Sequence, residues 1–463
     1  MKRSTKVSEM RNTQGQNLVD HVFYRSQRKR LPLIDRGEGI YFYDKDRRKY
    51  IDASSGALIS NIGHCIAPIV EAMRKQAEKI EFVHGTMFKS EPAIKLAHDL
   101  IEMCPGNLDR VYFVSGGSEA SETALKMARS YHVARGKEQK YIVISRWQSY
   151  HGATIGALSM SGRTMSRKIY QPLLLDFPHI PPAYCYRCPY EMEQETCRSE
   201  CAWELERAIN QIGAEYISAF IAEPIVGATL GAVPAPPEYF SIVREICDKY
   251  DVLFIADEVM TGFGRTGKNL GIEHWEVTPD IITGGKGLGA GYFPIGVAIC
   301  TDKVFQPFQE TLGSFTHGFT YQGNPLAAAV ALSVIDFIKE NKLVSYVARM
   351  GEYLMERLSS LYRFDFVGDI RGKGFMRGVE LVKDRGTKEP FPPQRGITKL
   401  VVETAWKKGL ILYPASGGQV QGVAGDAFMV APPFIATEGQ IDEIIHILDR
   451  TLEEVHKEIG ADR

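Results

Sequence analysis

The middle of the chain alternates between short apolar runs and longer stretches with a helical pattern. The apolar runs span residues 111–114, 141–144, 219–222, 252–256, 281–283 and 295–300. Uninterrupted apolar runs are typical of strands buried on both faces, and helix-length connections between them favour parallel pairing. Residues 119–135 place their apolar residues on one side of a helix. The pattern predicts an α/β fold, in which residues 66–340 form a large domain with a mostly parallel sheet and flanking helices.

The two ends of the chain show a different pattern. Residues 38–52 contain two β-rich runs around a polar turn, which predicts a hairpin, and residues 325–350 have the spacing of one long helix. We expect a small mixed α/β domain built from both ends, namely residues 1–65, which include an N-terminal arm, and residues 341–463. Residues 178–200 are rich in Pro, Cys and Tyr and have no period, so we predict a cysteine-rich insertion or long loop.

Composition and charge exclude several classes of protein. Of the 463 residues, 44% are hydrophobic and 24% are charged, as in ordinary globular proteins. The 55 basic and 56 acidic residues leave a net charge of -1, which gives no electrostatic case for a nucleic-acid partner. No stretch approaches the ~18 consecutive apolar residues of a membrane helix. We therefore expect neither nucleic acid nor membrane as a partner.

The first thirty residues are basic but contain no apolar segment of the kind found in secretory signals. A mitochondrial presequence shares this composition, although a solvated N-terminal arm is the favoured interpretation. Without an export signal the eight cysteines should be reduced. The expected location is the cytoplasm.

Small residues follow the apolar run 111–114 and precede the predicted helix. This stretch ends in Gly116, Gly117 and Ser118. Backbone N–H groups at a helix start bind phosphate, glycines let the anion approach closely, and the Ser118 hydroxyl adds a donor. A simple capped turn between a strand and a helix would explain the motif equally well.

Two acids, Asp257 and Glu258, follow the apolar run 252–256. Proteins with α/β folds place ligand-binding residues at the carboxyl ends of strands. The pair also resembles a nucleotide-binding Walker B motif, and residues 262–269 imitate a Walker A loop. Asn269 stands where magnesium needs Ser or Thr, and the loop follows the acids instead of the first strand, so we discount ATP chemistry.

A third motif is Lys286, which follows the run 281–283 and has glycines on both sides. Burial lowers the pKa of a lysine and makes it a nucleophile able to form a Schiff base. A phosphate cradle, a strand-end acid and a nucleophilic lysine are together what pyridoxal phosphate requires. Tyr150 could stack on the cofactor ring, whereas His151 alone could equally be structural.

Together these motifs resemble the class III aminotransferases, a group of fold-type I pyridoxal-phosphate enzymes. The resemblance runs from about residue 38 to 450 and is most specific in residues 255–267 and 283–288. It implies the fold of these enzymes and pyridoxal 5'-phosphate as cofactor. It also implies two catalytic residues, with Lys286 as the Schiff-base lysine and Asp257 as the partner of the pyridine nitrogen.

The resemblance implies the remaining cofactor contacts as well. Gly117 and Ser118 would hold the phosphate. Tyr150 would stack on the ring with His151 beside it, and Glu223 would support the site near Asp257.

Contacts to the other side of the cofactor follow in the same way. Val259 would pack against the second face of the ring, and Met260 stands where some members carry a ring-contacting Gln. Thr320 would reach the phosphate of a neighbouring subunit. The resemblance therefore implies a homodimer or higher homo-oligomer with its sites at the subunit interface.

Three departures from the family pattern bear on the substrate. Members that act on 4-aminobutyrate or ornithine carry an arginine at the position of Ala153 and a gating glutamate at that of Ala228. Amine:pyruvate members bind the acceptor carboxylate with an arginine in the segment that matches residues 421–426, where this chain has none. The small residues favour the ω-amino-acid or amine:pyruvate branch, and the acceptor carboxylate is left without an assigned partner.

The insertion contains Cys185 and Cys188, then Cys197 and Cys201. Paired cysteines at short spacing can form a structural zinc site. We favour free thiols or a disulfide-capable loop, and we predict no metal.

The resulting hypothesis is a transaminase that takes a small-molecule amine donor and a keto-acid acceptor, with pyruvate as the expected acceptor. Lys286 would move the proton as general base and acid. An amino-acid racemase or epimerase of the same family would use the same lysine. A non-catalytic binding protein on this scaffold is a further alternative, against which the presence of Lys286, Asp257 and Tyr150 counts.

Overall fold

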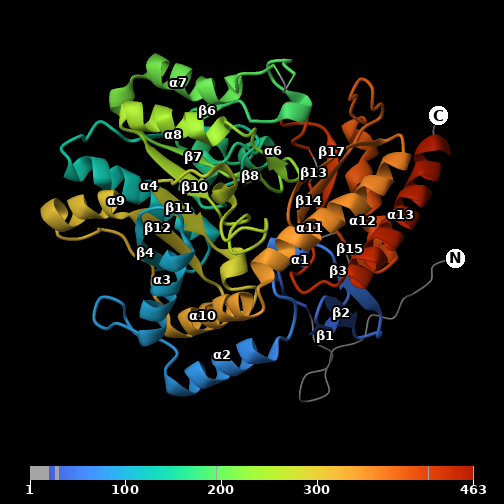
Figure 1. The fold of residues 1–463 in the computed structure, drawn as a ribbon, viewed down its shortest axis with the longest axis horizontal. Coiled ribbons are helices and arrows are strands. Elements are labelled where there is room, and N and C mark those ends of the chain that lie inside the picture. Colours follow the sequence, from blue (N-terminus) through green and yellow to red (C-terminus); the bar gives the residue numbers. More distant parts are fainter. Residues whose placement is uncertain (1–19, 27–30, 194–195, 416, 462–463) are drawn as a thin grey trace.

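A seven-stranded sheet forms the centre of the larger part of the molecule (Figure 1). The computed structural model describes residues 20–26, 31–193, 196–415 and 417–461. The strand order is β4 (Leu108–Val114), β12 (Gly296–Thr301), β11 (Ile281–Gly284), β10 (Leu253–Asp257), β7 (Ile217–Ala222), β5 (Ile142–Arg146) and β6 (His179–Ile180). Strands β11, β10, β7, β5 and β6 pair in parallel, whereas β12 is antiparallel to both β11 and β4. The mostly parallel sheet is therefore confirmed.

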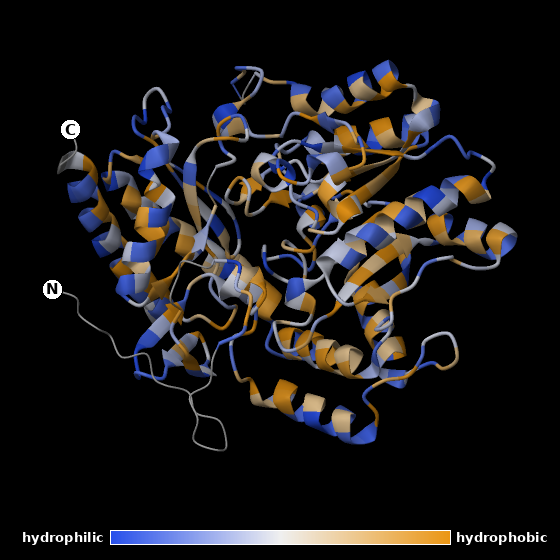
Figure 2. Ribbon diagram, turned by 180° about the vertical axis from the view of Figure 1, so that it is seen from behind, coloured by the Kyte–Doolittle hydropathy of each residue, from blue (hydrophilic) through white to orange (hydrophobic). Residues whose placement is uncertain are grey.

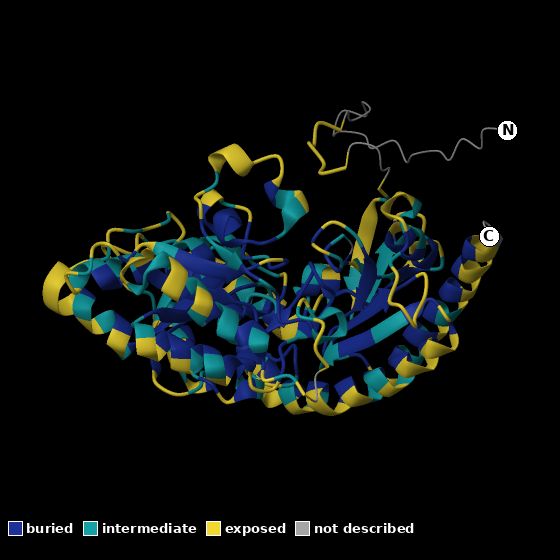
Figure 3. Ribbon diagram, turned by 90° about the horizontal axis from the view of Figure 1, so that it is seen from above, coloured by how far each residue is buried: buried dark blue, intermediate teal, exposed yellow. Residues whose placement is uncertain are grey.

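Helices cover both faces of this sheet. Leu253 and Ile255 share a cluster with residues of α4 (Gly117–Ala134) and α9 (Asp302–Pro307). Phe254 and Ala256 point the other way and pack with residues of α3 (Glu91–Met103), α7 (Glu200–Ile212) and α8 (Tyr239–Tyr250). Successive side chains of a strand alternate between faces, so double coverage requires an uninterrupted apolar run. The strands are accordingly buried between exposed outer helices (Figure 3).

The smaller part of the molecule combines both ends of the described chain. Strands β1 (Ile34–Glu38), β2 (Tyr41–Asp44) and β3 (Lys49–Asp52) form an antiparallel meander, and β15 (Leu410–Ile411) pairs in parallel with β3. A second sheet has the order β13 (Val367–Lys373), β14 (Met376–Leu381), β17 (Asp426–Val430), β16 (Tyr413–Pro414). The predicted hairpin is confirmed as β2 and β3. The division at residues 65 and 340 stays our proposal.

Helices α11 (Leu343–Ser359), α12 (Ile397–Lys407) and α13 (Glu438–Ala461) share one apolar cluster with these strands. Their ribbons carry alternating hydrophobic and hydrophilic bands, as expected of helices with one buried side (Figure 2). The other elements include α1 (Ser55–Leu58), α2 (Ala67–Lys79), α5 (Ile155–Met160), α6 (Thr164–Arg167), β8 (Ile225–Val226) and β9 (Val233–Pro234). Within the described residues, no helix combines the length and apolarity needed to cross a membrane.

The prediction of one helix over residues 325–350 is wrong. Helix α10 spans Pro325–Glu340, and α11 begins at Leu343. Between them Lys342 takes a left-handed conformation with φ 51°. The apolar pattern continues across this break because Val334 in α10 and Val347 in α11 both pack into the same cluster.

The cysteine-rich segment 178–200 is also less separate than predicted. His179 and Ile180 form β6, which pairs in parallel with β5 at the sheet edge, and α7 already begins at Glu200. Most of the basic N-terminal arm lies outside the described residues, and residues 20–26 are exposed.

Candidate active site

The predicted site residues gather at one edge of the large sheet. Asp257 is the last residue of β10, and Lys286 follows β11 by two residues. Gly116 and Gly117 follow β4, which runs in the direction of β10 and β11 because β12 is antiparallel to its two neighbours. The carboxyl ends of these strands therefore lie together, as in other open α/β sheets that bind ligands there.

The start of α4 is open to an anion. Gly116 precedes the helix, and no side chain of the described residues caps it. A Cβ at Gly117 would lie 2.6 Å from Cγ1 of Val259, and a Cβ at Gly285 would lie 3.3 Å from the Gly117 nitrogen. The helix start, Val259 and the loop of Lys286 are thus in contact, and the first N–H groups of α4 carry the positive end of the helix dipole.

Ser118 is held beside these N–H groups. Its Oγ accepts a hydrogen bond of 3.0 Å from the Ala153 nitrogen. Gly152 has φ 141°, and a Cβ there would lie 2.7 Å from the same Oγ, so this approach requires glycine. The Ser118 hydroxyl keeps its own proton available to donate to an anion.

Asp257 forms a buried pair with His151. The His151 Nδ1 lies 2.7 Å from Oδ2 of Asp257, and the Val259 nitrogen donates to Oδ1 at 3.1 Å. The His151 nitrogen in turn donates to Oγ of Ser161 at 2.8 Å. The His151 Nε2 is buried without a partner among the described residues. His151, which the sequence left open as a structural residue, therefore orients the acid through its Nδ1.

Glu223 fixes the backbone on which Tyr150 stands. Its Oε1 accepts from the Tyr150 nitrogen and its Oε2 from the Gly227 nitrogen, both at 2.9 Å. Burial raises the pKa of Glu223, and the charge of Asp257 adds to this rise while His151 opposes it. Met260 packs over the same turn, because a Cβ at Gly227 would lie 2.2 Å from its Sδ. Glu223 therefore fixes the turns of Tyr150 and Gly227, and Tyr150 and Val259 remain half-buried.

Lys286 presents an amine without a competing partner. It is half-buried, and its Nζ makes no hydrogen bond or ion pair with any described residue. Burial lowers its pKa to about 8, whereas Asp257 and Glu223 act in the opposite direction. At pH 7 about a tenth of the amine is therefore a neutral nucleophile, far more than for an ordinary lysine.

The glycines around Lys286 are explained by packing with the protein. A Cβ at Gly284 would lie 2.9 Å from Cζ of Phe263, and one at Gly287 would lie 2.1 Å from Nδ2 of Asn61. These glycines therefore admit neighbouring side chains around Lys286.

The neighbour of Asp257 has a structural role. Glu258 is fully buried, and its carboxylate accepts from the backbone nitrogens of Gly271 at 2.8 Å and Ile272 at 2.7 Å. Burial raises its pKa to about 7. The resemblance of the two acids to a nucleotide-binding motif thus has a structural explanation, since one acid faces the site and the other fixes a turn.

Arg265 is a residue whose role the sequence analysis missed. It is fully buried and donates to the carbonyl oxygens of Phe375 at 3.1 Å and Pro432 at 2.7 Å, and to Oγ of Ser55 at 3.1 Å. It thereby connects the glycine-rich loop after β10 to the smaller part of the molecule. Its position in that loop was visible, but partners 110 or more residues away were not.

Thr320 is exposed, in the loop before α10. Its expected contact is with a phosphate in a second subunit, so it stays a prediction. The four cysteines of the insertion line one cavity of about 240 Å³ and form no disulfide. No three His, Cys, Asp or Glu side chains of the described ranges are arranged to hold a common metal ion. That the protein binds no metal also stays a prediction.

The residues present fit pyridoxal phosphate. The uncapped start of α4 with Ser118 matches its phosphate, the oriented carboxylate of Asp257 matches a protonated ring nitrogen, and the unpartnered amine of Lys286 matches its aldehyde. No side chain would have to leave its hydrogen-bonding partner to make these three contacts.

Comparisons with known proteins agree with this fit. The family described as aminotransferase class-III matches residues 23–452. The chain is 41% identical to an uncharacterized aminotransferase, YodT, of Bacillus subtilis, over 93% of this chain and 97% of that protein. It is 35% identical to the putrescine–pyruvate aminotransferase of Pseudomonas aeruginosa, over 91% of this chain and 90% of that protein. The PMP-bound structure of an aminotransferase from Vibrio fluvialis superimposes with a TM-score of 0.86 at 34% identity, covering 92% of this chain and 93% of that chain.

Proposed function

Because this chain belongs to the class-III aminotransferases, we propose that it moves an amino group from an amine or ω-amino compound to a keto acid, with pyruvate as the acceptor. Aminotransferase activity and pyridoxal phosphate follow from the family. The donor, the acceptor and the roles of individual residues are the proposal.

The observation that carries the proposal is the free amine of Lys286 beside the oriented pair of Asp257 and His151. When bound, pyridoxal phosphate supplies an electron-accepting ring. Asp257 would keep the ring nitrogen protonated, and the hydrogen bond from His151 holds its carboxylate in place. Lys286 Nζ would take the proton from the donor carbon and return it as general acid, a task suited to a group with a pKa of about 8.

The other contacts with the cofactor would come from both sides of the site. Gly117 and Ser118 would hold the phosphate, with Thr320 of a second subunit. Tyr150 and Val259 would pack against the two faces of the ring.

The choice of donor rests on two small residues. Ala153 is exposed at the turn that follows His151, and Ala228 is buried after the turn of Glu223. Neither position offers a charge to a donor with a distal carboxylate, and an unpaired carboxylate is costly to bury. The putrescine–pyruvate activity of a 35% identical relative supports the same branch.

The proposed assembly is a homodimer or higher homo-oligomer, located in the cytoplasm. Exposed apolar side chains lie near Thr320, since Met87 is 76%, Phe88 65% and Tyr321 61% exposed. A Cβ at Gly85 would lie 3.4 Å from the Gln322 oxygen, so the two loops are neighbours. A second copy would cover this surface and bring Thr320 to the other site.

The proposal is tested by incubating the holoenzyme with a panel of amines and pyruvate and measuring alanine. We expect alanine with diamines and neutral amines, and less with 4-aminobutyrate or ornithine. A protein that makes no alanine from any donor, but interconverts the enantiomers of an amino acid without an acceptor, would be an epimerase and would contradict the proposal.

A further inference from the structure

A keto acid brings a carboxylate into the site, and that carboxylate needs a cation. Arg265 and Arg146 lie nearby, but both are buried and occupied. Arg265 uses its guanidinium on oxygens of the protein, including the carbonyls of Phe375 and Pro432. Arg146 donates to the Glu223 carbonyl and lies over the ring of Tyr239. Neither is available to a substrate without breaking internal bonds.

Arg163 differs from both. It is half-buried, and its guanidinium makes no hydrogen bond, ion pair or ring contact with a described residue. Arg163 is thus a flexible cation that is partly removed from water. Its guanidinium N–H donors are available to bind an anionic ligand. Arg25 also lies in this region, but it is exposed, where its charge is screened.

The backbone places Arg163 beside the loop of Tyr150. The Gln148 nitrogen donates to the Gly162 carbonyl at 3.0 Å, and the Gly162 nitrogen donates to Oγ of Ser149 at 3.1 Å. The His151 nitrogen donates to Oγ of Ser161 at 2.8 Å. Residues 161–162 are therefore tied to residues 148–151, and Arg163 is the next residue in the chain.

The charge of Arg163 affects the pKa of a hydroxyl in the site. Burial raises the pKa of the Tyr150 hydroxyl, and the charges of Tyr413 and Asp257 add to this rise. Arg163 opposes it. The guanidinium thus acts on the same hydroxyl as the acid that faces the cofactor.

Residues 421–426, the segment that carries an arginine in amine:pyruvate members but not in this chain, lie against the same turn. A Cβ at Gly422 would lie 2.7 Å from Oγ1 of Thr164 and 3.9 Å from Cγ of Gln148. Residues 421–422 and 163–164 are therefore neighbours. A cation on either segment could serve the same region, and this chain carries it on the segment of residues 163–164.

We propose that Arg163 binds the carboxylate of the keto-acid acceptor, and the carboxylate of the amino acid formed from it. This inference rests on the proposed function. An amine donor without a carboxylate does not need Arg163, so the residue separates the two halves of the reaction. In the donor half, the unpaired side chain can turn aside.

The experiment measures the two half-reactions of the holoenzyme separately, by the absorbance change of the cofactor. In Arg163→Gln the concentration of pyruvate for half-maximal rate should rise about ten- to a hundred-fold, because one charge-assisted contact is lost. The donor half-reaction with a neutral amine, and the acceptor half-reaction with an aldehyde that lacks a carboxylate, should change less than about twofold. Arg163→Lys should recover part of the lost pyruvate binding, since lysine keeps the positive charge but lacks the paired N–H donors of the guanidinium.

Lys168→Gln is the matched control, because Lys168 is an exposed cation at the end of the same short helix. It should leave both half-reactions unchanged. If Arg163→Gln leaves the pyruvate dependence unchanged, or slows pyruvate and the aldehyde equally, the inference is wrong while the proposed function stands. If the wild-type protein fails to react with pyruvate at all, the proposed function itself fails.

Discussion

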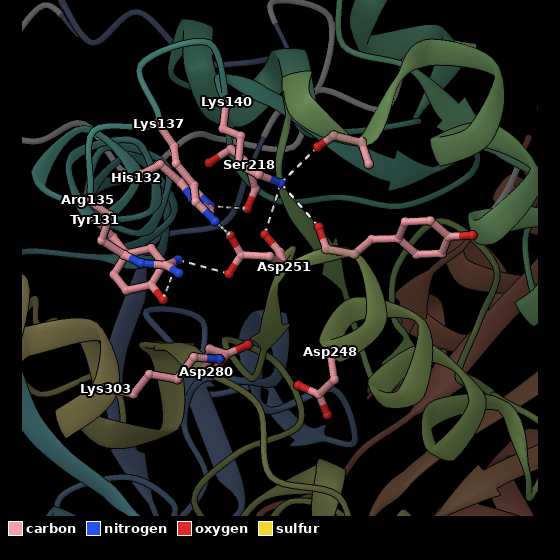
Figure 4. Close-up of polar contacts among 12 residues, drawn as sticks. Tyr131, His132, Arg135, Lys137, Lys140, Ser218, Asp248, Asp251, Asp280 and Lys303 are labelled. Atoms are coloured by element: carbon pink, nitrogen blue, oxygen red, sulfur yellow. Dashed lines mark hydrogen bonds and ion pairs between the residues drawn. The ribbon is translucent and has the colours of Figure 1, made fainter.

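Lys140 and Lys286 lie at opposite edges of the large sheet, and Lys140 is buried whereas Lys286 is half-buried. Lys140 precedes β5 and is 5% exposed. Its Nζ lies within hydrogen-bonding distance of four carbonyl oxygens, those of Ala214 at 2.8 Å, Ile217 at 2.9 Å, Asp251 at 3.0 Å and Tyr250 at 3.2 Å. Figure 4 shows Lys140 beside Asp251. Lys286 follows β11, and its Nζ contacts no acceptor among the described residues.

Several polar groups around Lys140 are paired as well. The carboxylate of Asp251 accepts from Arg135 at 2.8 Å and from Lys137 at 2.6 Å, and His132 Nε2 lies 2.9 Å from the Ser218 carbonyl. These bonds tie together the amino ends of β5, β7 and β10. The cluster is therefore structural, since a buried ammonium with every proton donated has no capacity left for chemistry.

The carboxyl edge is built in the opposite way. Among the described residues, the amine of Lys286, the N–H groups at the start of α4 and the guanidinium of Arg163 have no partner there. Unsatisfied groups destabilise a fold, so we infer that a ligand completes these three. Burial lowers the pKa of both lysines, and what separates Lys286, the proposed catalytic lysine, is its lack of acceptors among the described residues.

The largest effect is expected from Lys286→Ala. Loss of the base and of the covalent attachment should reduce turnover at least about 10³-fold. The variant should fold normally, because no described residue bonds to the amine. The measurement is alanine formation from an amine and pyruvate, with gel filtration to test whether the cofactor stays attached. Full activity in this variant would remove the basis of the comparison.

Asp257→Asn should affect rate more than cofactor binding. The amide keeps the shape of the carboxylate but cannot hold a proton on the ring nitrogen, so proton removal should slow by about 10²–10³-fold. Single-turnover rates measured together with the dissociation constant of the cofactor separate the two effects. Normal single-turnover rates would show that the pair with His151 has only a structural role.

The sequence predicts a site residue when the neighbouring residues in the chain are enough to fix its position. Asp257 and Lys286 could be proposed from the sequence because each lies at the end of a buried apolar run, and their proposed roles require little beyond that position. Lys140 and Arg163 were not found. Lys140 was missed because its carbonyl partners lie 74 to 111 positions away in the sequence. Arg163 was missed because its place depends on a turn that is held by hydrogen bonds. The break at Lys342 was missed because the apolar spacing is the same on both sides of it.

Lys140→Met should reverse the pattern expected for Lys286. The carbonyls around it would lose a shared donor at a buried site, and we expect a loss of about 2–4 kcal/mol in the free energy of unfolding. Activity per folded molecule should stay unchanged. Urea unfolding and kcat on the same preparation test both parts, with the half-exposed Lys137→Met as the milder control. A fall in kcat without loss of stability would contradict the structural assignment.

The smallest effect concerns the titration of Lys286. Its amine attacks only when neutral, and burial brings its pKa to about 8. As the pH rises toward that value, the rate at which pyridoxal phosphate attaches to the apoenzyme should therefore increase about tenfold per pH unit. Above that value the rate should level off. Asp257 raises this pKa, so in Asp257→Asn the plateau should begin at lower pH. Stopped-flow absorbance between pH 6 and pH 10 measures both profiles. A wild-type rate that still climbs up to pH 10 would mean that the amine is as well solvated or as well bonded as an ordinary lysine, and the contrast with Lys140 would disappear.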